Sequence, residues 1–113
     1  MAAYVSNIVI EAGADFNQTF NIEDIGNSPL NLTGYTGASR MKKHYSSLTT
    51  SATFTVTFPN RTQGIMKIAL AASSTAVLKP GRYVYDVLLN DGSEKTRVIE
   101  GSALVTAGIT TTV

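Results

Sequence analysis

Residues 81–101, "GRYVYDVLLNDGSEKTRVIEG", decide the fold class, because they read as two β-strands joined by a tight turn. β-Branched and aromatic residues alternate on both sides of Asp91-Gly92, and this dipeptide is the strongest short-range signal for a two-residue hairpin loop. The pairing expected from such a loop sets Asp86 directly opposite Arg97. The stretch therefore predicts an antiparallel hairpin in a β-rich protein.

The two faces of the expected hairpin differ in composition. One face is aromatic and aliphatic and is predicted to cover the core: Tyr83, Tyr85, Val87, Leu89, Thr96 and Val98. The other face mixes charged with aliphatic side chains: Arg82, Val84, Asp86, Leu88, Lys95, Arg97 and Ile99. That mixture suits a protein–protein contact better than a catalytic cleft. The simpler alternative is an ordinary domain surface, which routinely carries a few aliphatic side chains.

Strand signals also recur through the rest of the chain, separated by Gly, Pro, Asn and Asp. Further strands are expected at 4–10, 15–23, 32–43, 52–59, 65–71 and 102–107, and one helical turn at 73–78, capped by Ser73 or Ser74. With seven or eight strands and at most one short helical turn, the predicted class is all-β. The expected architecture is an antiparallel, Ig-like β-sandwich that forms a single domain over residues 1–113.

Composition narrows the classes of partner. The net charge is +1 and only 15% of the residues are charged, so neither nucleic acid nor a membrane surface is expected to bind. A surface with so little charge is poorly protected against association, and a homo-oligomer is expected. The chain has no cysteine, no signal peptide is recognised at its start, and no apolar run approaches the ~20 residues that span a bilayer.

Residues suited to catalysis are scarce. The single histidine, His44, follows two lysines and is interpreted as a solvated loop residue, because no acid or nucleophile is fixed near it. Hydrolase and phosphate-binding motifs are absent. Acidic residues at the hairpin tip and around the 15–23 strand do not match a dense calcium loop. The sequence thus predicts no enzyme activity, no cofactor and no metal site.

The densest basic patch of the sequence contains Arg40, Lys42 and Lys43. Arg40 and Lys42 fall on one face of an expected strand, and Lys43 on the other. Lysines on a strand edge often only discourage unwanted pairing. The sharper hypothesis is an ion-pairing contact with an acidic neighbour in an assembly, and Arg40 and Lys42 are therefore added to the candidate contact residues.

Several segments resemble a known family: "GADFNQTFNIEDIGNSPLNLTGYTGASRMKK", "GIMKIAL", "GRYVYDVLL" and "RVIEGSALVTAGIT". Together they resemble the small β-sandwich structural proteins of tailed-phage virions, as found in phages of cyanobacteria, and the N-terminal modules of baseplate upper proteins. The matching positions are Gly13, Asp15, Phe16, Pro29, Leu32, Thr33, Gly34, Tyr35, Gly81, Tyr83, Tyr85, Asp86, Gly101, Val105 and Thr110. The chain departs from that pattern at "SRMKK" and "TAGIT".

The resemblance implies a non-enzymatic phage virion structural protein, present in many symmetric copies and located in the virion. An independent chain of this size favours a capsid decoration or cement role, with the major capsid protein as neighbour; the alternative is a tail or baseplate component. A rival from another class is a carbohydrate-binding module at a host surface. Sugar sites usually use exposed aromatic platforms, and the tyrosines are expected to pack in the core or the loops.

Overall fold

Eight strands and two short helical turns make up the fold in the computed structural model, which describes residues 4–23, 26 and 28–109. The strands are β1 (Tyr4–Val5), β2 (Ile8–Glu11), β3 (Phe16–Asn21), β4 (Thr36–Lys42), β5 (Ala52–Asn60), β6 (Ile65–Leu70), β7 (Gly81–Asn90) and β8 (Lys95–Thr106). The helical turns are η1 (Arg61–Gln63) and α1 (Ala72–Thr75). The all-β class is confirmed, although one helical turn more than expected is present.

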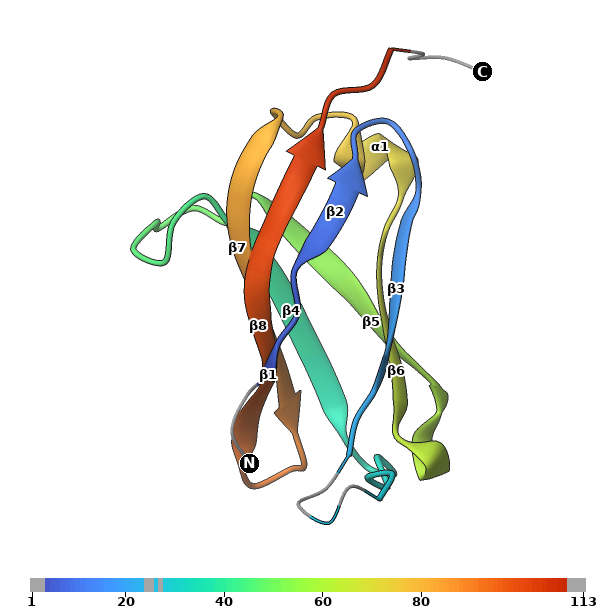
Figure 1. The fold of residues 1–113 in the computed structure, drawn as a ribbon. Coiled ribbons are helices and arrows are strands. Elements are labelled where there is room, and N and C mark those ends of the chain that lie inside the picture. The colour runs from blue at the N-terminus through green and yellow to red at the C-terminus, as the bar shows by residue number, and fades with distance from the viewer. Residues whose placement is uncertain (1–3, 24–25, 27, 110–113) are drawn as a thin grey trace.

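The strands form a single hydrogen-bonded path in the order β1-β8-β7-β4-β5-β6-β3, and β2 also pairs with β8. β5 connects the two halves, because its first residues pair with β4 and the residues from Thr55 onward pair with β6. The sheet therefore curls into a nearly closed, barrel-like shape in which β7 and β8 lie on one side and β3 and β6 on the other (Figure 1).

The prediction of a purely antiparallel sheet is wrong at one edge. β1 and β2 run parallel to β8, so the sheet is mixed. A parallel pair joins segments that are distant in sequence, in this case the two ends of the described chain, and no local turn signal announces it. The strand expected at 4–10 is also divided in two at Ser6-Asn7.

One hydrophobic core fills the space between the two halves of the sheet. The Phe54 ring lies 5.8 Å from that of Phe16 and 6.0 Å from that of Tyr85, centroid to centroid, so an aromatic row links β3, β5 and β7. Aromatic pairs at such separations stabilise beyond the area that they bury. Phe16 and Phe20 point inward on β3, and the threonines of β5 point outward, as the alternation of apolar and polar residues along both strands requires.

The α1 turn is held by residues from the other end of the chain. A carboxylate oxygen of Asp15 accepts a hydrogen bond from the backbone N–H of Ala72 at 2.7 Å. The Thr75 hydroxyl accepts from the N–H of Gly13 at 3.1 Å and donates to the carbonyl of Ala14 at 2.8 Å. The expected cap by Ser73 or Ser74 is therefore wrong, because the capping carboxylate comes from the β2–β3 turn.

The hairpin of β7 and β8 has a longer loop than Asp91-Gly92 predicts. Asn90 pairs with Lys95, and four residues, 91–94, form the loop. The Asp91 carboxylate stabilises this longer loop by accepting from the N–H groups of Ser93 at 2.9 Å and Glu94 at 2.7 Å. Such local bonds from an aspartate stabilise turns.

A bulge then changes the register again within the same pair of strands. Leu88 pairs with Arg97, but Val87, the residue just before Leu88, pairs with Ile99. Val98 is therefore left as the extra residue of a bulge in β8. Both Val98 and Ile99 are buried as a result. The prediction that Ile99 belongs to the outer face is therefore wrong, whereas the core assignment of Val98 is confirmed. β8 also continues unbroken to Thr106, so the separate strand expected at 102–107 is its second half.

Candidate functional site

The face of β4, β7 and β8 that points away from the core carries the candidate contact residues. Pairing of β4 with β7 sets Arg40 opposite Asp86 and Lys42 opposite Val84. Side chains directly opposite one another on neighbouring strands share a face of the sheet. This surface, here called the outer face, therefore brings Arg40 and Lys42 of β4 beside the hairpin, although the two segments lie far apart in the sequence.

An open hollow of about 440 Å³ lies on the outer face. β4, β7 and β8 form its floor and walls, and the loop of residues 43–51 contributes Tyr45 and Thr50. That loop, drawn in green, projects from the body of the protein beyond β7 (Figure 1). Candidate contact residues that line the hollow are Arg40, Lys42, Val84, Asp86, Leu88 and Arg97.

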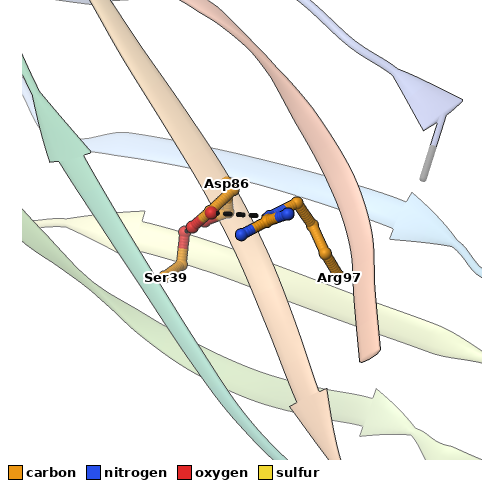
Figure 2. Close-up of polar contacts among 3 residues, drawn as sticks. All are labelled: Ser39, Asp86 and Arg97. Atoms are coloured by element: carbon orange, nitrogen blue, oxygen red, sulfur yellow. Dashed lines mark hydrogen bonds and ion pairs between the residues drawn. The ribbon is translucent and has the colours of Figure 1, made fainter. Parts of the chain in front are cut away.

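An ion pair crosses the hollow. The Nε–H group of Arg97 donates to a carboxylate oxygen of Asp86 at 2.9 Å (Figure 2). The predicted pair thus forms, but diagonally, because the four-residue loop sets Arg97 opposite Leu88 rather than opposite Asp86. The Arg97 side chain stays 52% exposed and that of Asp86 38%. Exposed pairs of this kind contribute only about 0.2–1 kcal/mol to stability.

Ser39 fixes the position of the strand that carries Asp86. The hydroxyl of Ser39 is buried in the sheet and donates to the backbone carbonyl of Asp86 at 2.7 Å (Figure 2). A buried hydroxyl without a partner would cost free energy, so this bond ties β4 to β7 beneath the ion pair. Nothing in the sequence singled out Ser39, since its partner is a backbone atom on another strand.

Tyr45 and Leu48 are the surface residues that the sequence interpretation missed. Tyr45 was expected, like the other tyrosines, to pack in the core or the loops, but the residue is 75% exposed and borders the hollow. Leu48, on the same loop, is 99% exposed. The signal that could have found them is an aromatic and an aliphatic side chain within an otherwise polar connector.

Other predicted residues lie outside the hollow. Arg82 and Lys95 are exposed near opposite ends of the hairpin, and Ile99 is buried in the core. Lys43 turns to the other face, as expected, and its Nζ atom lies 4.6 Å from the centre of the Tyr83 ring. His44 is exposed in the 43–51 loop, where its backbone N–H donates to the Ser47 hydroxyl.

Acidic side chains do not gather into a metal site in the described part of the chain. Within 4–23, 26 and 28–109, no three histidine, aspartate or glutamate side chains lie together as metal ligands would. Asp24, an acid beside the strand expected at 15–23, lies outside the described residues. None of the helices in the described part of the chain is long and apolar enough to cross a membrane.

The Asp91 carboxyl at the hairpin tip is expected to make the stability of the fold depend on pH. The N–H groups of Ser93 and Glu94 hold the pKa of the Asp91 carboxyl below its usual value of 3.8. A carboxyl whose pKa is lowered by folding stabilises the fold fully above its unfolded pKa, and this contribution is lost as the pH falls through the folded value. We expect Asp91→Asn to be less stable than the wild type at pH 7, and the difference to shrink below about pH 4. Urea unfolding at both pH values measures it; a difference that stays constant would contradict the loop geometry.

Comparison with known proteins leaves the family open. No protein-family model matches the chain, and no curated protein is similar to it. Among solved structures, InlP of Listeria monocytogenes is similar with 14% sequence identity and a TM-score of 0.48 over 92% of this chain. The chain spans only 28% of the length of that protein.

Proposed function

We propose that the chain is a non-enzymatic structural protein that packs against neighbouring proteins through its outer face. The observation that carries this proposal is the makeup of that face, where Val84, Leu88 and exposed Tyr45 lie among arginine and lysine side chains around a hollow. Tyr and Arg are enriched at protein interfaces, and aliphatic side chains among them provide the apolar contact.

The setting that we propose for this contact is a phage virion. The support is the resemblance of the sequence to small virion proteins, together with the low charge of the chain. In that setting the chain decorates or cements the capsid in many symmetric copies, with the major capsid protein as neighbour. A tail or baseplate position is the alternative within the same class.

A carbohydrate-binding module is the second candidate function, and one observation favours it. Tyr45 is exposed beside charged and polar groups, as an aromatic platform for a sugar ring would be. Leu48 and the aliphatic floor are less suited to a sugar than to a protein. A glycan array that showed selective binding lost in Tyr45→Ala would place this function first.

Particle composition tests the proposed function. Virions purified from the phage that encodes the chain are expected to contain it at a fixed copy number per major capsid protein, measured by quantitative mass spectrometry. Loss of the chain at high salt, with the copy number restored when the protein is added back, would identify an external decoration. Absence from purified virions would overturn the proposal.

Substitutions of Asp86 test whether its carboxylate serves assembly rather than folding. We expect Asp86→Lys to change the unfolding free energy of the isolated chain by less than about 1 kcal/mol, because the ion pair is exposed. Incorporation into particles should fall, because Arg97 then loses the carboxylate that holds its guanidinium in place on the contact surface. Asp86→Asn is the control that removes the carboxylate without adding a cation. A loss of thermal stability as large as the loss of incorporation would contradict an interface role.

A further inference from the structure

The hollow on the outer face is basic. Arg40, Lys42 and Arg97 line it, against the single carboxylate of Asp86. Arg97 uses its Nε–H group for the ion pair, and a guanidinium carries five N–H donors in all. Arg40 is exposed and Lys42 half-buried, so both cationic groups border the opening. Among the residues that line the hollow, three cations stand against the one carboxylate of Asp86. Glu100 lies opposite Asp86 on β8 but does not line the hollow, so the lining keeps a net positive charge that attracts an anionic group.

The apolar and aromatic side chains around the hollow define the class of ligand more closely than its charge does. Half-buried Val84 and Leu88 provide apolar surface between the cations. The neighbouring loop presents Tyr45 at the rim and the almost fully exposed Leu48 beyond it. A small anion would use the cations alone, and a sugar ring would use the cations and Tyr45. An acidic polypeptide that also carries an apolar side chain would use all of these groups.

We propose that this hollow binds an acidic segment of a neighbouring protein. Carboxylates of the segment pair with Arg40, Lys42 and the outer edge of Arg97, and an apolar side chain of the segment packs on Val84 and Leu88. Arginine suits such contacts, because its planar guanidinium can hold a carboxylate by two hydrogen bonds while an aliphatic stem packs alongside. The inference rests on the proposed function and names the chemistry of the partner at the same surface.

Binding of a model peptide by the full chain tests the inference. The probe is a short acetylated and amidated peptide in which aspartates flank a central leucine, and amide chemical shifts of the isotope-labelled chain report both the site and the affinity. We expect shifts concentrated at Arg40, Lys42 and residues 84–88. Binding should weaken about tenfold or more in Arg40→Glu, and weaken with added salt, as charge-directed contacts do.

Matched controls make the result specific. Lys67→Glu makes the same kind of charge change on β6, in the other half of the sheet, and should bind the peptide as the wild type does. The same peptide with lysine in place of aspartate should not bind. Unchanged amide spectra away from the substituted residue check that both variants remain folded.

Several outcomes would overturn the inference. They are an absence of shifts with the acidic peptide, equal binding of the lysine peptide, and an Arg40→Glu variant that binds as well as Lys67→Glu does. Tighter binding of an oligogalacturonate than of the acidic peptide would assign the hollow to an anionic sugar instead. If the chain binds the peptide but is absent from virions, the virion function is refuted and the acidic-segment site stands. If the chain is present in virions but does not bind the peptide, only the acidic-segment site is refuted.

Discussion

Replacing Gly101 with alanine is expected to detach the N-terminal strands and to cost about 3 kcal/mol of unfolding free energy. Gly101 is buried in β8 where the chain between β1 and β2 passes closest. A Cβ atom at this position would overlap the Ser6 carbonyl oxygen and lie 2.8 Å from its carbon. Because the obstacle is backbone, no side-chain rotation can relieve it. The same carbonyl accepts the Tyr85 hydroxyl at 2.5 Å, so its displacement also breaks a bond to the core.

Hydrogen exchange and urea unfolding together check this result. Amide protection should fall in β1 and β2, while β4, β5 and β6, which pair with neither of these strands, keep more of theirs. Ser102→Ala, at the next residue of β8, is the matched control. It removes only an exposed hydroxyl bond to Asn7 and should cost less than about 1 kcal/mol. A Gly101→Ala variant as stable as Ser102→Ala would show that β1 and β2 do not approach β8 as described.

Truncation of Ile99 to alanine is expected to cost about 2–5 kcal/mol, the usual range for a fully buried isoleucine. Ile99 has no exposed surface and lies opposite Val87 in the core. The simple two-residue hairpin would instead set Ile99 on the outer face, opposite Val84. The size of the effect therefore distinguishes the bulged register from the regular one.

Val84→Ala is the comparison that completes the test. Val84 lies half-buried on the outer face, opposite Ser102, so its truncation should cost less than about 1 kcal/mol in the isolated chain. Chemical denaturation of both variants gives the two values. Equal costs for Ile99→Ala and Val84→Ala would contradict the bulge at Val98.

Alternation along single strands was sufficient to predict which side chains enter the core. Tyr83, Tyr85, Val87 and Leu89 are all buried, as their period of two required. The same alternation separates the phenylalanines from the threonines in β5. Each of these predictions depends only on neighbours along one strand, because successive side chains of a strand point to opposite faces.

Alternation along single strands could not predict how the strands pair with one another. The Asp91 carboxylate stabilises a four-residue loop as readily as Asp91-Gly92 suggests a two-residue one, and the difference shifts every pair of the hairpin. The bulge at Val98 and the parallel strands β1 and β2 depend on tertiary packing. No residue type in those segments indicates a bulge or a parallel pairing.

The candidate site was predicted in composition but not in shape. Arg40 and Lys42 were proposed together with the hairpin residues, and the pairing of β4 with β7 brings them to one surface. The contribution of Tyr45 depends on where the 43–51 loop projects, which strand patterns do not specify. Ile99 was included wrongly, because a single bulge moves it from one face to the other.

Cryo-microscopy of the virion tests the proposed role of the outer face most directly. We predict repeated copies of the chain whose β4, β7 and β8 face contacts a neighbouring protein, with carboxylates of that neighbour beside Arg40 and Lys42. Copies in which this face is open to solvent, or particles that lack the chain, would contradict the proposal.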